Sequence, residues 1–98
     1  MEVYWGGTWG TVCNDYWGIS DATVVCRELG YSRALRAVTD GTFGGNYALD
    51  ILLDNVFCNG DEVTVFDCPH NGVGVHNCRH YEDAGVRCGR SAECFNNL

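Results

Sequence analysis

The residues of this sequence that could do metal or nucleophilic chemistry are cysteines and histidines crowded into one short stretch. Cys68-x-His70 and His76-x-Cys78-x-His80 lie within thirteen residues. Structural zinc takes four such ligands, usually spaced by about two to five residues, so the one-residue spacings here fit poorly. A cysteine committed to a disulfide cannot bind zinc. We therefore expect these histidines to form hydrogen bonds in loops rather than a zinc centre.

Catalysis is not expected either. The sequence contains neither the Gly-x-Ser-x-Gly turn that presents a serine nucleophile nor the His-Glu-x-x-His helix of zinc proteases. A Cys–His pair could supply a nucleophile and its base, but a bridged cysteine is no nucleophile. The sequence therefore predicts a protein that binds other molecules and is not an enzyme.

Seven cysteines in 98 residues predict a covalently cross-linked domain. In a short chain this density is typical of a disulfide framework formed in an oxidising, extracellular compartment. A domain of this size is often marginally stable without such help. Six cysteines allow fifteen pairings, and the sequence alone leaves the choice open. The cysteines stand at positions 13, 26, 58, 68, 78, 88 and 94.

The charge balance limits the classes of partner. Thirteen carboxylates stand against six arginines, with no lysine, for a formal net charge of −7. Phosphate binding needs a basic surface, so nucleic acid is not expected as a partner. An acidic surface favours metal ions and basic partners, although excess acid can also serve only solubility.

No segment of the sequence looks like a membrane span or a leader. No window approaches the roughly 20 apolar residues that cross a bilayer, so no direct membrane insertion is expected. The start of the chain lacks the charged and apolar regions of a secretory signal. We therefore expect a piece of a longer secreted or membrane-anchored protein.

The clearest helix signal covers about residues 21–29. Ser20 is expected to cap the first turn, and Asp21 suits the positive end of a helix. Gly30 fits the left-handed stop after the last turn. The apolar stripe consists of Ala22, Val25, Cys26 and Leu29, at i, i+3, i+4 and i+7.

Several short apolar runs predict strands. Residues 3–5 and 8–13 flank Gly6-Gly7, which is a hairpin signal. Residues 51–53, 56–58 and 84–88 also indicate strands, and residues 63–68 indicate a strand or a helical turn. Residues 31–48 show little pattern. The three tryptophans are expected to pack in the core and at its rim.

Together these motifs resemble the scavenger receptor cysteine-rich domain, and the likeness runs from Glu2 to Cys88. They keep the order of that family along nearly the whole chain. The segments that carry the resemblance are Trp9-Gly10-Thr11-Val12-Cys13, Val24-Val25-Cys26-Arg27-Glu28-Leu29-Gly30-Tyr31, Leu53-Asp54-Asn55-Val56, Cys68-Pro69-His70-Asn71-Gly72, His76-Asn77-Cys78 and His80-x-Glu82-Asp83-Ala84-Gly85-Val86-x-Cys88.

The resemblance implies a fold and a set of disulfides. The fold is a small α+β domain in which a curved antiparallel sheet cradles one helix among long loops. Group A members have six cysteines, and group B members add a pair, one of which would stand at Tyr31, so the chain resembles group A. The implied pairs are Cys13–Cys78, Cys26–Cys88 and Cys58–Cys68. Cys94 is left over, and pairing within a larger protein, pairing between chains and a free thiol all stay open.

The resemblance also implies cation sites. In the family one site uses an Asp pair at positions 14 and 15 with the acid at Glu82. Here Asn14 replaces the first Asp, which removes a negative charge and should weaken the site. A second site lies near the residues that match Asp15, Asp54, Asn55 and Asn77. Oxygen ligands of this kind suit calcium. The alternative is that these groups only cap turns and hydrogen-bond loops.

Arginines near the helix exit offer a different kind of site. Arg33 and Arg36, with Arg27 close by, could bind an anionic ligand directly, as the resemblance implies for some members. The alternative is that they pair with nearby acidic side chains.

From these residues we expect residues 2–89 to form one extracellular binding domain and residues 90–98 to form a tail or the start of a linker. Its function is expected to be calcium-assisted recognition of anionic or basic macromolecules, of the scavenger or pattern-recognition type used in innate immunity. Such ligands include proteins, polyanionic polysaccharides and microbial surfaces. The alternative is a spacer or interaction domain within a larger secreted enzyme or receptor. An intermolecular disulfide through Cys94 is a further possibility.

Overall fold

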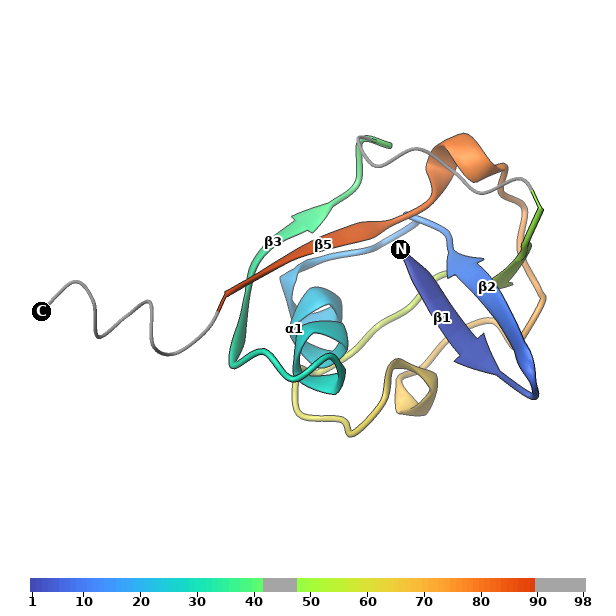
Figure 1. The fold of residues 1–98 in the computed structure, drawn as a ribbon. Coiled ribbons are helices and arrows are strands. Elements are labelled where there is room, and N and C mark those ends of the chain that lie inside the picture. The colour runs from blue at the N-terminus through green and yellow to red at the C-terminus, as the bar shows by residue number, and fades with distance from the viewer. Residues whose placement is uncertain (42–47, 90–98) are drawn as a thin grey trace, which may run out of the picture.

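The computed structural model describes residues 1–41 and 48–89 as two small sheets and one α-helix (Figure 1). Strands β1 (Glu2–Trp5), β2 (Thr8–Val12) and β4 (Asp50–Leu53) form one sheet, and β3 (Arg33–Val38) pairs with β5 (Gly85–Gly89) in the other. Helix α1 (Ile19–Glu28) packs against β3 and β5, and two short 3₁₀ helices lie at Val65–Asp67 (η1) and His80–Glu82 (η2). The expected α+β class with one helix is confirmed. Cys94 lies outside the described residues.

The β1–β2 hairpin follows from its two glycines. Gly6 and Gly7 adopt φ values of 57° and 87°, the left-handed conformation at both central positions of a tight hairpin turn. Trp5 and Thr8 are therefore directly paired, and Val3 lies opposite Gly10. This part of the sequence prediction is confirmed.

The three-stranded sheet is mixed, which corrects the expectation of a purely antiparallel sheet. β4 runs parallel to β2, with Thr11 opposite Ile51 and Val12 opposite Leu53. A parallel pair needs a crossover of about a dozen residues or more, and the segment holding α1 and β3 supplies it. Because parallel strands end at the same edge, the residues that follow Val12 and Leu53 lie side by side.

The start of α1 differs from the expected cap. The cap residue is Gly18 instead of Ser20, and the Asp21 side chain accepts a hydrogen bond from the Gly18 N–H at 2.8 Å. The second oxygen of Asp21 accepts from the Cys58 N–H at 2.6 Å. Burial raises the pKa of Asp21, although the N–H donors oppose this shift. One buried carboxylate therefore both caps the helix and holds the loop at Cys58.

The end of α1 is confirmed, but its apolar stripe is shorter than expected. Gly30 has φ +92°, as a left-handed stop requires. Leu29 is 62% exposed, whereas Val24 is fully buried and takes a place in the core. The buried face of the helix therefore includes Val24 and leaves out Leu29, so it differs slightly from the expected stripe.

One strand was not predicted from the sequence, and one predicted strand is absent. Residues 33–38 form β3 although apolar and polar residues do not alternate along them. Antiparallel pairing with β5 holds their backbone as a strand. Residues 56–58 are not a strand. Val56 is buried among core side chains, and the Phe57 N–H donates to the Pro69 carbonyl at 2.9 Å in a loop. The run 63–68 contains η1, in line with the helical alternative.

The core lies between the helix, the sheets and the η1 loop. Trp17 is 5% exposed, and its indole N–H donates to the Gly85 carbonyl at 3.0 Å, while Trp5 and Trp9 lie at the rim. Within the described part of the chain, no helix is long and apolar enough to cross a membrane. The buried cluster comprises Val3, Val12, Trp17, Val24, Val25, Leu52, Leu53, Val56, Val65, Cys68 and Ala84.

A substitution at Gly10 tests the close approach of β2 and β4. A Cβ atom at this position would overlap the Leu52 side chain and lie 2.7 Å from the Asp50 carbonyl oxygen. We expect Gly10→Ala to lower the free energy of unfolding by about 1–3 kcal/mol, the usual cost of overpacking. Urea unfolding with the disulfides intact measures this. Thr8→Ala, at the exposed start of the same strand, should stay within about 0.5 kcal/mol. Equal stability of the two variants would contradict the packing argument.

Candidate functional site

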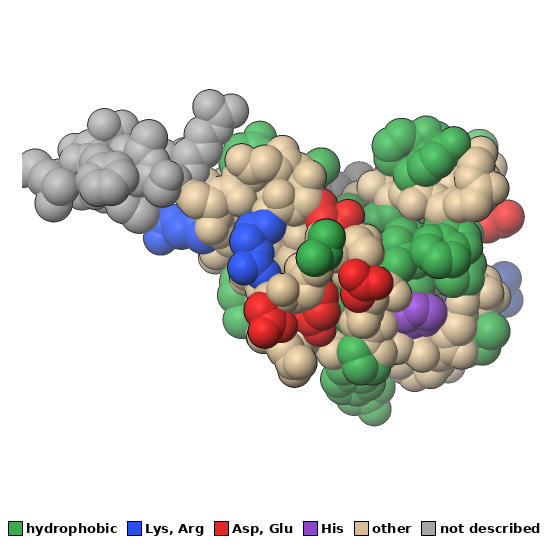
Figure 2. All heavy atoms as spheres, turned by 90° about the horizontal axis from the view of Figure 1, so that it is seen from below, with side chains coloured by type: hydrophobic (Ala, Val, Ile, Leu, Met, Phe, Trp, Pro, Cys, Tyr) green, Lys and Arg blue, Asp and Glu red, His purple; other side chains and the backbone are tan. Residues whose placement is uncertain are grey.

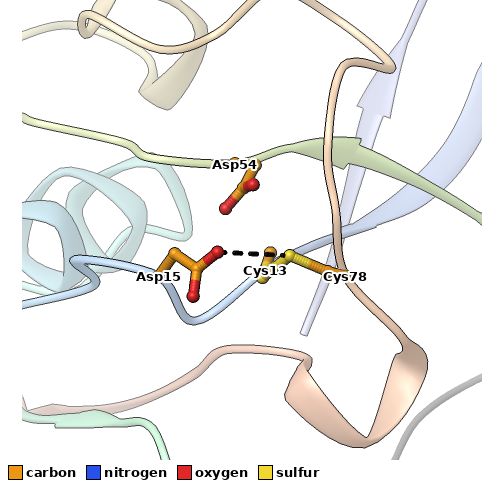
Figure 3. Close-up of side chains that lie close together, drawn as sticks. All are labelled: Cys13, Asp15, Asp54 and Cys78. Carbon is orange, nitrogen blue, oxygen red and sulfur yellow. Dashed lines mark hydrogen bonds between the residues drawn. A yellow bond between two sulfur atoms is a disulfide. The ribbon is translucent and has the colours of Figure 1, made fainter.

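The Cys13–Cys78 disulfide joins the end of β2 to the loop before η2 (Figure 3). Its Cα atoms are 6.2 Å apart, and both cysteines are buried. The other bridges, Cys26–Cys88 and Cys58–Cys68, complete the set that the family resemblance implies. The first bridge sets the place where loops from distant parts of the chain meet.

Two carboxylates face each other beside this bridge. Asp15 follows the end of β2 and Asp54 follows the end of β4, so the parallel pairing of the strands brings them to one edge. The Asp15 and Asp54 side-chain oxygens lie within 4.8 Å of each other and of the bridge sulfurs. Asp54 is 1% exposed, and Asp15 is half-buried. The Asp15 Oδ2 atom lies 3.5 Å from the Cys78 sulfur, the contact dashed in Figure 3; a disulfide sulfur has no hydrogen to donate.

The Asn77 amide lies against both carboxylates. One orientation of the amide turns its oxygen toward acceptors only and its nitrogen toward donors only. Rotating the amide by 180° lets the nitrogen donate to Asp15 Oδ2 at 3.1 Å and to Asp54 Oδ2 at 3.3 Å. With the oxygen inward, three oxygens would converge with no hydrogen between them, which a cation could stabilise. Asn77 can therefore satisfy the carboxylates itself or join them as a ligand.

The electrostatic state of the pair follows from its surroundings. Burial, followed by the negative charge of Asp54, raises the pKa of Asp15. Within residues 1–41 and 48–89 no basic side chain pairs with Asp15 or Asp54, so neither carboxylate is neutralised by one. When both carboxylates are ionised, the folded domain carries a repulsion that a bound cation would relieve.

Backbone hydrogen bonds hold Asp54 in position. Its Oδ1 atom accepts from the Asn55 N–H at 2.8 Å, and its carbonyl accepts from the Asn71 N–H at 3.2 Å. Asn55 adopts φ 54°, a conformation that asparagine tolerates better than most residues. Asn55 thus contributes to the site through its backbone, by orienting the Asp54 carboxylate.

Asn14 and Glu82 were expected as ligands, and their backbones are hydrogen-bonded to each other. The Asn14 N–H donates to the Glu82 carbonyl at 2.7 Å. The Asn14 amide donates instead to the Thr39 carbonyl at 2.8 Å, and a Glu82 side-chain oxygen accepts from the Arg79 N–H at 3.0 Å. Their side chains hold loops, and Glu82 is not part of the Asp15–Asp54 cluster.

Arg33 and Arg36 lie exposed on β3, and the structure adds Arg87 to them. Arg36 stands directly opposite Arg87 of β5, while Arg33 stands opposite Gly89. The sequence did not predict β3, so this cross-strand register could not be found from the sequence.

The Cys/His stretch forms loop hydrogen bonds, as expected. The Nδ1 atoms of His70 and His76 accept from the N–H groups of Gly72 and Cys78 at 2.9 and 3.0 Å. A second grouping, of Cys58, Glu62 and Cys68, contains a disulfide, and its carboxylate accepts from the Asn59 and Gly60 N–H groups. The hydrogen bond from the Asn59 N–H is the main cause that lowers the pKa of Glu62. This carboxylate therefore stabilises its own loop.

Acidic and apolar side chains share the surface. On the face shown in Figure 2, acidic groups gather near the centre, a basic group lies beside them, and hydrophobic side chains reach the surface.

Comparison with known proteins gives a consistent result. The family model of the scavenger receptor cysteine-rich domain matches residues 1–89. The macrophage receptor MARCO of Mus musculus is 52% identical over 87 residues, which cover 89% of this chain and 16% of that protein. Lysyl oxidase homolog 3A of Danio rerio is 44% identical over 88 residues, covering 90% of this chain and 12% of that protein. A scavenger receptor cysteine-rich domain superfamily protein of Patiria pectinifera is 51% identical over 88 residues, covering 90% of this chain and 8% of that protein. The chain thus spans less than a fifth of these relatives.

Solved structures agree with this match. The dimeric form of the SRCR domain of mouse MARCO superposes with a TM-score of 0.81 at 50% identity, covering 91% of this chain and 83% of that one. The third SRCR domain of murine neurotrypsin superposes with a TM-score of 0.77 at 49% identity, covering 89% and 80%. With its three disulfides, this chain therefore belongs to the scavenger receptor cysteine-rich domain family, as an extracellular domain of group A type.

Proposed function

We propose that this domain is a non-catalytic ligand-binding module whose contacts are assisted by calcium held between Asp15 and Asp54. The observation that carries the proposal is the pair of facing carboxylates, one of them 1% exposed, with no basic side chain paired to either in the described residues. Burying negative charge without a positive partner is unfavourable. A divalent cation between the two carboxylates replaces their repulsion with attraction to the ion.

The ligand types point to a hard cation. Two carboxylates and the Asn77 amide oxygen are all oxygen donors, which calcium prefers, with water completing a shell of about six to eight ligands. The neighbouring sulfurs are bonded to each other and are not available as thiolates. Extracellular calcium modules bind at about 10⁻⁴–10⁻³ M, and a site with two carboxylates belongs at the weak end.

Such a site offers a simple mode of recognition. A partly exposed calcium ion keeps positions open for a sulfate, phosphate or carboxylate of a ligand. Without calcium, the same carboxylates can meet a lysine or arginine of a protein partner. Each contact is modest, and several copies of a domain would raise the total affinity through avidity. The similarity to a macrophage receptor supports this binding role.

The extent of the binding unit forms part of the proposal. Residues 2–89 would make the folded module, and residues 90–98, outside the described chain, would be a tail or the start of a linker. Cys94 would be available there for a bridge between chains.

A spacer role is the alternative function, and one observation favours it. A relative named as a lysyl oxidase homolog contains a similar stretch amounting to 12% of its length, so such a domain can accompany an enzyme. In that case the domain would separate or join neighbours and bind no free ligand. Ligand screens with and without calcium, against bacterial surfaces, sulfated polysaccharides and basic proteins, distinguish the two functions.

Calcium should stabilise the domain. At free calcium ten times the dissociation constant, binding adds about 1.4 kcal/mol to the free energy of unfolding. For a domain of this size that corresponds to a rise in Tm of about 5–10 °C. Differential scanning calorimetry with 10 mM calcium and with EDTA measures the difference, and Asp15→Ala should abolish it.

The matched control is Asp67→Ala, which removes the same charge from an exposed position in η1. This variant should keep the calcium response. Absence of heat in a calorimetric titration of the unmodified domain with millimolar calcium would rule out the cation site.

The pH dependence without calcium gives a second prediction. Because burial and Asp54 raise the pKa of Asp15, the folded state binds its proton more tightly than the unfolded state does. This contribution to stability is therefore gained as pH falls through the folded pKa and is complete below the unfolded value. We expect the domain in EDTA to gain stability over this acid interval relative to Asp15→Asn. Urea unfolding of both proteins from pH 7 to pH 4 tests this, and parallel curves would contradict it.

A further inference from the structure

A hollow of about 330 Å³ lies beside the Cys13–Cys78 bridge and has no role in the proposed cation site. Its lining consists of residues 49–51 together with His76, Cys78, Arg79 and His80. Its volume is at the lower end of the range for small-molecule sites, about 300–1,000 Å³. The start of β4 and the disulfide-bonded Cys78 form part of its wall.

The His80 ring is fixed in the wall of this hollow. Its Nε2 atom lies 2.7 Å from the Leu49 carbonyl oxygen, which can only accept, so Nε2 carries a hydrogen. Its Nδ1 atom lies 2.9 Å from an Asp83 carboxylate oxygen. The Thr11 hydroxyl donates to the same carboxylate at 3.0 Å. Oxygen atoms at both ring nitrogens, from Leu49 and Asp83, hold the ring in place.

Arg79 supplies an uncompensated positive charge at the same hollow. Its backbone N–H is bonded to Glu82, but among the described residues its guanidinium makes no hydrogen bond or ion pair. The side chain is exposed. A guanidinium in this state can bind a carboxylate or a sulfate through two parallel hydrogen bonds.

His76 adds a donor of fixed identity. Its Nδ1 atom accepts a hydrogen bond from the Cys78 N–H at 3.0 Å, so in the neutral ring the hydrogen must be on Nε2. That N–H is therefore free to donate to a ligand. A guanidinium and an imidazole N–H in the lining of one hollow offer two donors to an anion.

Asp50 decides which kind of anion suits the hollow. Its exposed carboxylate also lines the hollow and makes no ion pair with any described residue. A small inorganic anion would be repelled there, whereas a sugar ring can donate its hydroxyl hydrogens to a carboxylate. We propose that the hollow binds an acidic sugar unit, with its carboxylate or sulfate on Arg79 and His76 and its hydroxyls toward Asp50.

This inference rests on the proposed ligand-binding function but does not need the cation. The hollow and the Asp15–Asp54 pair share only the bridge, through Cys78. An acidic polysaccharide could therefore contact the hollow directly while another group of the same chain meets the cation site.

Calorimetric titration in EDTA tests the proposal with three tetrasaccharides. A galacturonic acid tetramer carries carboxylates, a carrageenan tetrasaccharide carries sulfates, and maltotetraose is neutral. We expect one or both acidic probes to bind, and the neutral probe to bind at least about tenfold more weakly. Arg79→Ala should weaken the acidic probe about tenfold or more, as loss of a charge-assisted pair does. Arg27→Ala removes an exposed arginine on α1, outside the hollow, and should change binding less than about threefold.

Two further variants separate the hollow from a general charge effect and from the cation site. Asn in place of His76 can accept the same Cys78 N–H in a turn but lacks the ring N–H, so His76→Asn should weaken the acidic probe and leave calcium binding intact. Asp15→Ala should do the reverse. Equal losses in Arg79→Ala and Arg27→Ala, or equal binding of neutral and acidic probes, would overturn the proposal. So would no binding of any probe to the unmodified domain. A failed calcium titration alone would leave the hollow standing.

Discussion

The Cys13–Cys78 bridge is the constraint on which the remaining site depends. It joins positions 65 residues apart, and by the loop-entropy model such a closure removes about 4 kcal/mol of freedom from the unfolded chain. Its position matters as much as its energy. Asp15 lies two residues beyond one cysteine and Asn77 one residue before the other, so the bridge brings a carboxylate and an amide together. On its other side Cys78 lines the hollow that holds His76 and Arg79.

The parallel pairing of β2 and β4 completes what the bridge begins. Both strands end at one edge, which places Asp54 against Asp15 with no intervening basic side chain among the described residues. Gly10 allows this pairing because Leu52 occupies the space that a side chain would need. Sheet geometry and disulfide geometry thus converge on one charged pair.

The hairpin, the helix and the closing strand were predictable from local signals: Gly6-Gly7, the periodic apolar residues before Gly30, and the run to Cys88. β3 was not, because residues 33–38 carry no alternation and become a strand only through their partner β5. The disulfide pairs came from the family resemblance. In the cluster, Asp15, Asp54 and Asn77 came from the same source, whereas the side chains of Asn14 and Glu82 turn to nearer backbone partners. Such competition between a ligand role and a local hydrogen bond depends on geometry that the sequence does not carry.

The order of the chain has a consequence for biosynthesis. Cys13 and Cys26 are both made early, yet their partners stand at positions 78 and 88, and β3 also awaits β5. Until the last dozen residues of the folded part emerge from the ribosome, neither long bridge can form correctly, and the two early thiols are exposed to each other. Oxidation that runs ahead of translation would then give a Cys13–Cys26 link, which thiol–disulfide exchange must undo before the native pairs form.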